Sequence, residues 1–112
     1  MELPAAKHTL GDFDDALRSL RDTVLMMASL TERLLASASE SLSARSFEAC
    51  ERVIADDAEI DNLEKSVDEA GVAILVRFQP LANDLREVVA AMKVSTNLER
   101  VGDQAVGIAR RA

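Results

Sequence analysis

The side chains best suited to chemistry are carboxylates near the C-terminal end of the chain. Glu99 and Asp103 lie four residues apart in the stretch LERVGD, so a helix would place both on one face. Gly102 stands between them, although glycine costs a helix interior about 1 kcal/mol relative to alanine. That cost is understandable if a neighbouring backbone, or an ion with its waters, comes close to this turn. Close packing of helices is the alternative explanation.

A second acidic group precedes the first and consists of Asp56, Asp57, Glu59, Asp61, Glu64 and Asp68. A break at Gln79-Pro80 would make the two groups part of one helical hairpin. Residues at equal heights in an antiparallel hairpin have numbers that add to a constant, which is about 160 for a turn centred on Pro80. Asp57 is then level with Asp103, and Asp61 with Glu99. We therefore expect four carboxylates, two from each helix, at one height.

Four carboxylates in one patch repel one another, so their pKa values rise or a cation compensates them. Arg52 and Arg100 are near enough in sequence to serve, and Glu32 of a preceding helix could join the acids. A hard multivalent ion such as Mg²⁺, Ca²⁺, Mn²⁺ or ferric iron would compensate them better. The single histidine, His8, is distant in sequence, so a histidine-rich zinc site is not expected. Ordinary solvated surface acids would give the same pattern without a metal.

Three long apolar-periodic segments predict the elements that position these acids. The first is expected at residues 12–42, with Asp12 as its N-cap, and its apolar positions recur every three or four residues. They are Phe13, Leu17, Leu20, Val24, Met27, Thr31, Leu34 and Ala38. Residues 1–11, which contain Pro4 and Gly11, are expected to form an N-terminal arm.

Two further helices are expected at residues 46–78 and 80–111. Ser46 is suited to cap the second helix, and Pro80 to open the third. The seam of the third helix consists mostly of small residues, namely Val88, Ala91, Ser95, Leu98, Gly102, Ala105 and Ala109. Short connections between three such helices predict an all-α, antiparallel up-down-up three-helix bundle over residues 12–112.

Composition narrows the class of protein. The 112 residues carry 20 acidic and 13 basic side chains, a net charge of −7, which argues against binding of nucleic acid or anionic lipid through charge. The single cysteine, Cys50, allows no internal disulfide and falls at an apolar-periodic position. No stretch has the length and apolarity of a membrane span. We expect a cytoplasmic protein that reaches a membrane only through partners.

The motifs of the hairpin resemble those of the PhoU family. The segment QPLANDLR, Gln79 to Arg86, is similar to a family signature that opens a helix, and LERVGDQAVGI, Leu98 to Ile108, to the signature that follows it. The segments from Arg52 to Ala70 and from Lys7 to Leu30 are similar to other parts of the family pattern. The resemblance extends over nearly the whole chain.

The resemblance implies a helical protein built from three-helix repeats whose acidic motifs bind metal. Carried onto this sequence, the ligands would be Asp57, Asp61, Glu99 and Asp103, the same four that the hairpin arithmetic selects. The metal would be a divalent or trivalent ion, Fe, Zn, Ni, Mn or Mg, of unspecified identity. Family members are negative regulators of the phosphate starvation response and of phosphate uptake. They are thought to link PstB, the ATPase subunit of the phosphate ABC transporter, to the sensor histidine kinase PhoR.

One departure concerns length, because a full family member has two such repeats and this chain resembles only the first. Two copies side by side would imitate the tandem form, so a homodimer is expected. Arg77, Asp84 and Arg86 are candidates for partner binding, although a helix-terminal charge and a local ion pair would account for the last two equally well. The alternatives are an accessory protein of another phosphate transporter and a structural dimerisation module. A metal-dependent hydrolase is disfavoured because no His, Cys or Ser near the acids suggests a base or nucleophile.

Overall fold

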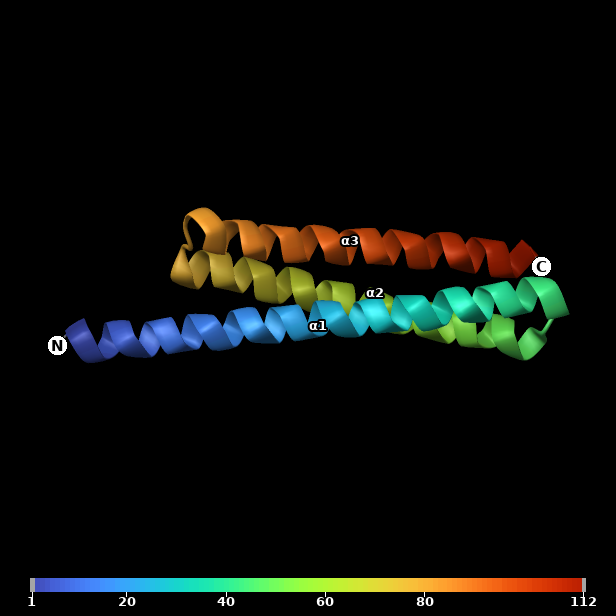
Figure 1. The fold of residues 1–112 in the computed structure, drawn as a ribbon, viewed down its shortest axis with the longest axis horizontal. Helices are drawn as coiled ribbons and strands as arrows, with labels where there is room; N and C mark the ends of the chain where they lie inside the picture. The colour runs from blue at the N-terminus through green and yellow to red at the C-terminus, as the bar shows by residue number, and fades with distance from the viewer. Residues whose placement is uncertain (1, 112) are drawn as a thin grey trace.

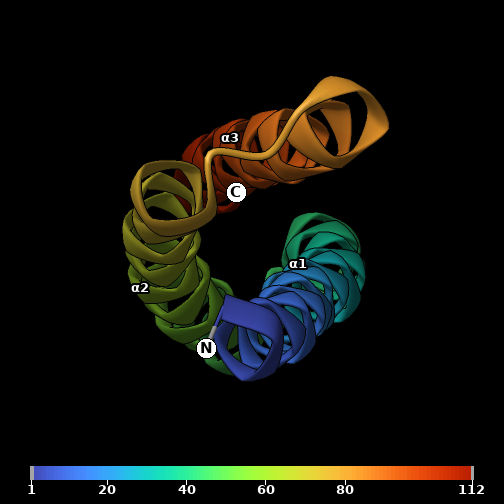
Figure 2. The same ribbon diagram turned by 90° about the vertical axis from the view of Figure 1, so that its left-hand side faces the viewer.

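Three helices form the fold, in the all-α up-down-up arrangement that the sequence predicts. The computed structural model describes the backbone of residues 2–111 and the side chains of residues 11–111. Its helices are α1 (Glu2–Ala44), α2 (Phe47–Phe78) and α3 (Ala82–Arg111), and no strand occurs in this part of the chain. Figure 1 shows the helices side by side along an elongated body of 65 × 19 × 16 Å. Each helix contacts both others, and Figure 2 shows this arrangement from one end.

The core follows the predicted apolar stripes. On α1 every predicted position is buried except Val24, which packs partly buried against the core. On α2 and α3 the buried positions include Val53, Ile60, Val67 and Val88, together with the small residues Ser95, Gly102, Ala105 and Ala109. These small residues bring α3 close to its neighbours, which is why its buried face carries so little side-chain volume.

The start of α1 differs from the prediction. The helix begins at Glu2 rather than at residue 12, so the segment expected to form a non-helical arm has helical backbone. Pro4 permits this because proline is tolerated in the first turn of a helix, where its missing N–H would have no partner. Asp12 consequently lies inside the helix and caps nothing. Its carboxylate instead accepts a hydrogen bond from Arg77 Nη2 at 2.8 Å.

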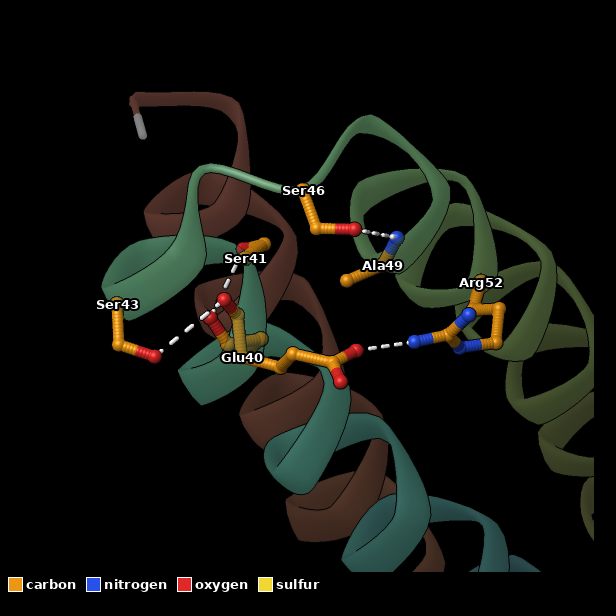
Figure 3. A network of polar contacts seen from close by, with 7 residues as sticks. Glu40, Ser41, Ser43, Ser46, Ala49 and Arg52 are labelled. Atoms are coloured by element: carbon orange, nitrogen blue, oxygen red, sulfur yellow. Dashed lines mark hydrogen bonds and ion pairs between the residues drawn. The ribbon is translucent and has the colours of Figure 1, made fainter.

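The connection between α1 and α2 agrees with the prediction at Ser46. Its hydroxyl accepts a hydrogen bond from the N–H of Ala49 at 3.1 Å, which satisfies one of the free donors at the start of α2. Figure 3 shows this cap beside an ion pair between Glu40 of α1 and Arg52 of α2. The turn is thus fixed both by its backbone and by a link between the two helices.

The connection between α2 and α3 is longer than predicted. Gln79 adopts a left-handed conformation (φ 47°, ψ 56°) and its N–H bonds to the carbonyl of Leu75, which ends α2. The carbonyl of Leu81 accepts hydrogen bonds from the N–H groups of Asp84 and Leu85. Helix α3 therefore begins at Ala82, and Pro80 lies in the connection rather than in the first turn. The centre of the hairpin nevertheless stays at Pro80, which preserves the predicted register.

None of the three helices has the combination of length and apolarity that crossing a membrane requires, within the residues that the structure describes. Cys50 is partly buried against the core, and its thiol donates to the carbonyl of Ala109 across the α2–α3 contact at 3.8 Å. This agrees with the packing role that its position in the sequence predicts.

Candidate functional site

The predicted carboxylates meet between α2 and α3. One carboxylate oxygen from each of Asp61, Glu64 and Glu99 lies within 4.8 Å of the other two. Asp103 is hydrogen-bonded to Glu99 through their carboxyl groups, and it also acts electrostatically on Asp57. The structure therefore brings together all four predicted side chains, at the heights that the hairpin arithmetic gives. Their role as metal ligands stays a prediction.

Glu64 is the member of this group that the sequence reasoning left out of the site. The signal was present, because Glu64 follows Asp61 by three residues and Asp57 by seven, and such spacings share one helix face. The hairpin arithmetic considered only residues exactly level with the Glu99–Asp103 pair, whereas a glutamate side chain reaches along its helix. We call these five residues, Asp57, Asp61, Glu64, Glu99 and Asp103, the carboxylate cluster.

Gly102 makes room for one member of the cluster. A Cβ atom at this position would lie 2.8 Å from Oδ1 of Asp57, closer than real Cβ contacts come. The carboxylate of Asp57 therefore occupies the space that the side chain of any residue other than glycine would need at position 102. This explains a glycine in the middle of a helix beside an acid pair. The close approach is made by a side chain from the facing helix, which neither of our sequence-based explanations named.

Burial, hydrogen bonding and the nearby acids together raise the pKa values of three members of the cluster. The pKa of Glu99 rises from 4.5 to about 7, first because Asp103 is hydrogen-bonded to its protonated form and then because of burial and the nearby acids. Burial, followed by the Asp103 and Asp61 charges, raises the pKa of Asp57. Burial, followed by Asp68 and Asp61, raises the pKa of Glu64. The cluster thus holds excess negative charge that it accommodates by retaining protons.

The arginines expected to neutralise the cluster are engaged elsewhere or have no resolved effect on it. Arg52 pairs with Glu40 on α1, and the exposed Arg100 is not among the groups that shift the cluster's pKa values. Arg110 lowers the pKa of Asp57, but as the smallest of the contributions. Glu32 is exposed and does not join the cluster. Compensation by protein cations is therefore weak.

The neighbouring residue Asp56 differs from the cluster because an arginine neutralises its negative charge. Asp56 is buried, and its two oxygens accept hydrogen bonds from Nε and Nη2 of Arg33 at 3.0 and 2.6 Å. This two-point contact links α1 to α2. Asp57, the next residue, lies about 100° further round α2, where its carboxylate faces Gly102 of α3 and not a guanidinium. The difference marks the carboxylate cluster as an acidic group that no arginine pairs with in this way, within the residues that the structure describes.

The donor set of the cluster fits a hard metal ion. Ligands on opposite sides of one ion are separated by about 4 to 5 Å, twice the 2.0–2.6 Å bond to Mg²⁺ or Ca²⁺. The 4.8 Å limit on Asp61, Glu64 and Glu99 falls in this range. These three carboxylates, without a nitrogen or sulfur donor, favour Mg²⁺, Mn²⁺, Ca²⁺ or iron over softer ions. The geometry can therefore concentrate a cation.

The three residues expected to bind partners lie near the α2–α3 connection, away from the cluster. Arg77 bonds to Asp12 and its guanidinium stacks on the ring of Phe78, 4.7 Å from the centroid. Arg86 donates from Nη1 to Asn83 at 3.1 Å, and Asp84 is exposed in the first turn of α3. The arginines thus have local structural partners, and the ion pair that we considered between Asp84 and Arg86 is replaced by the contact with Asn83.

Comparison with known proteins decides the family. The family model described as the PhoU domain matches residues 24–112, which include all of α2 and α3 and the whole carboxylate cluster. The chain belongs to the PhoU family. The similarity that its motifs indicate is therefore confirmed over the part of the fold that holds the candidate site.

Several curated PhoU proteins are similar to this chain over nearly its full length. The phosphate-specific transport system accessory protein PhoU of Edwardsiella tarda is 39% identical over 106 residues, and that of Escherichia coli (strain K12) is 37% identical over 106 residues. A PhoU homolog of Zymomonas mobilis is 41% identical over 104 residues. These alignments cover 93–95% of this chain but 44% of each relative. The chain thus spans less than half the length of the PhoU proteins it matches.

Proposed function

We propose that this chain is an accessory protein of phosphate transport that represses the phosphate starvation response and restrains phosphate uptake. It would act in the cytoplasm as a metal-binding adaptor between the ATPase subunit of a phosphate ABC transporter (PstB) and a sensor histidine kinase (PhoR). It would reach the membrane only through these partners and would act as a homodimer. Support for the first part comes from the relatives, which carry the name phosphate-specific transport system accessory protein.

The observation that carries the proposal is that this chain, a member of the PhoU family, contains the carboxylate cluster. Its acids lie at the predicted heights, crowding raises the pKa values of Asp57, Glu64 and Glu99, and Gly102 costs helix stability to admit Asp57. A folded protein gains nothing from such repulsion by itself. A bound cation would turn the repulsion into coordination, so the arrangement is accounted for by metal binding.

Protons compete with the metal at this site. Because the pKa of Glu99 is raised to about 7, a cation must displace a proton from the Glu99–Asp103 pair at neutral pH or below. Occupancy should therefore rise with pH through this range. A bound metal would link α2 to α3 across the hairpin. The shape of the adaptor would then depend on how much metal is available.

A non-enzymatic role fits the arrangement better than hydrolysis does. A metal hydrolase needs an open coordination position with a base or nucleophile beside it, whereas our proposal uses the carboxylates of the cluster to hold the metal. An accessory protein of a different phosphate transporter would share the family and the cluster, and differs only in its partners. The exposed Asp84 and Arg86 at the opposite end of α3 remain our candidates for partner contact.

Complementation in the host tests the function. The gene is deleted, alkaline phosphatase activity is assayed in phosphate-rich medium, and the wild-type chain or a Glu99→Ala, Asp103→Ala variant is restored. The matched control is Glu51→Ala with Glu69→Ala, which removes two exposed acids of α2 outside the cluster.

We expect deletion to derepress the phosphatase, and expect the wild type and the control variant to silence it again. The cluster variant should leave it active. A phosphatase that stays silent after deletion would contradict the regulatory role and favour an accessory of another transporter. Silencing by the cluster variant would show that the acids are dispensable for regulation and would favour a structural module.

A further inference from the structure

The seam between α1 and α3 carries two exposed apolar stripes in matching register. Arg21 of α1 pairs with Glu87 of α3 across this seam. Residues seven apart on a helix lie on nearly the same face, so the stripes that start at this pair follow the seam. They are Ala28, Leu35 and Leu42 on α1, and Val94, Val101 and Ile108 on α3.

These stripes are only partly covered within the chain. Leu35, Leu42, Val94 and Ile108 are 46%, 53%, 45% and 44% exposed. Isolated exposed apolar side chains are ordinary on protein surfaces, but a continuous strip of them marks an interaction site. Here the strip runs for about 20 Å along two parallel helices, at 1.5 Å per residue.

The positions just outside the stripes are almost free of charge. They are Leu25, Glu32 and Ser39 on α1, and Ala90, Asn97 and Gln104 on α3, all of them exposed. Among these six positions and the six residues of the stripes, only Glu32 is charged, whereas 29% of all residues in the chain are charged. Nine of the 20 acidic residues lie on α2, on the other side of the bundle (Figure 2). The seam is therefore the face on which two copies with a net charge of −7 each can approach.

The pattern of the seam is self-complementary. Leu34 and Gly102 are in contact range across the core, so Leu35 and Val101 are at about the same height. A two-fold axis at this height pairs each of these residues with its own copy, Ala28 with Leu42, and Val94 with Ile108. It also places Asn97 opposite Gln104 and Glu32 opposite Ser39, so no like charges meet. This is the symmetry of an isologous dimer.

We propose that the α1–α3 seam is the homodimer interface, with a two-fold axis at the height of Leu35 and Val101. The inference specifies the surface of the homodimer named under the proposed function and does not depend on metal binding. The α1–α3 faces of two copies would stack as an antiparallel four-helix bundle, with α2 and its acids on the outside.

The area of the seam indicates how tightly the two copies should bind each other. A strip about 20 Å long and about 18 Å wide covers about 360 Å² on each copy. Stable complexes bury about 800 Å² per partner, so the dimer should be weak and should dissociate on dilution. Sedimentation velocity between about 5 and about 300 µM would span a micromolar dissociation constant.

Charge substitution at the axis tests both the surface and the symmetry. Leu35→Glu and Leu35→Arg each place like charges against their own copy, whereas an equal mixture of the two places opposite charges together. We expect each variant alone to dimerise at least about tenfold more weakly than wild type, and the mixture to recover most of the dimer. The control pair is Val72→Glu and Val72→Arg, at an exposed apolar position of α2.

Each outcome of this experiment is decisive. If the wild type stays monomeric throughout, both the homodimer and this interface are wrong. If it dimerises and the Leu35 variants do so equally well, the homodimer stands and this surface is wrong. Failure of the mixture to recover the dimer would contradict the axis. Should circular dichroism show that the Leu35 variants unfold, Ile108→Glu mixed with Val94→Arg makes the same test at positions that the axis brings together.

Discussion

Replacing Gly102 by alanine tests whether the carboxylate cluster binds metal without strongly changing the stability of the fold. The new Cβ would lie 2.8 Å from Oδ1 of Asp57, but 3.8 Å from Cδ1 of Ile60 and 3.9 Å from Cδ1 of Leu34. The two apolar distances are ordinary van der Waals contacts. The conflict is therefore with the Asp57 carboxylate alone, which must rotate away from α3.

The free energies involved nearly cancel. Alanine stabilises a helix interior by about 0.5–1 kcal/mol relative to glycine, and an off-rotamer Asp57 costs about 0.5–1.5 kcal/mol. The metal-free variant should therefore unfold within about 1 kcal/mol of wild type. Metal affinity should fall at least about tenfold, because a side chain of the cluster has left its place. A large effect on metal binding with a small effect on stability is the signature to look for.

Two titrations measure this difference. Urea unfolding with a chelator present gives the stability of the metal-free protein, and Mn²⁺ titration gives the affinity. Gly107→Ala is the matched control, because a Cβ there meets no atom within 4 Å. The control should gain stability and keep its Mn²⁺ affinity. The reasoning is refuted if Gly102→Ala binds Mn²⁺ as tightly as Gly107→Ala does.

Three further predictions concern stability. The folded protein holds a proton on Glu99 between pH 4.5 and about 7 that the unfolded chain releases, so the free energy of unfolding without metal should fall by about 1 kcal/mol across this range after solvent screening. Glu99→Gln should flatten that slope in urea unfolding at several pH values. Ser46→Ala should cost about 1 kcal/mol by removing the α2 cap, whereas Ser43→Ala at an exposed site should cost little in the same assay. Arg33→Ala should lower the melting temperature because it leaves the buried Asp56 carboxylate without its partner, and an unchanged melting temperature would contradict the importance of that pair.

Local chemistry made most of the fold predictable. The apolar stripes of the three helices fix which faces are buried, and Ser46 and Pro80 mark the connections that define the register. Because both α2 and α3 run unbroken from one hairpin turn, a single number for its centre placed Asp57 beside Asp103 nearly fifty residues away. Regular helices carry positional information over long distances, which irregular structure does not.

The features of the structure that the sequence did not predict have physical reasons. The early start of α1 was missed because Pro4 reads as a helix breaker, although in a first turn it breaks nothing. The inclusion of Glu64 depends on the reach of its side chain, which a count of helical heights omits. The contact of Asp57 with Gly102 depends on the separation of two helix axes, which spacing along a sequence does not contain.

The central claim is that the carboxylate cluster binds a metal, and direct titration of the purified chain with Mn²⁺ and with iron tests it best. The wild type, a variant with Asp57→Asn, Asp61→Asn, Glu99→Gln and Asp103→Asn, and the Glu51→Ala, Glu69→Ala control would be compared at one pH above 7. We predict saturable binding by the wild type and the control, and loss of that binding in the fourfold variant with its helical content intact. Equal binding by all three proteins, or no saturable binding by the wild type, would contradict the claim.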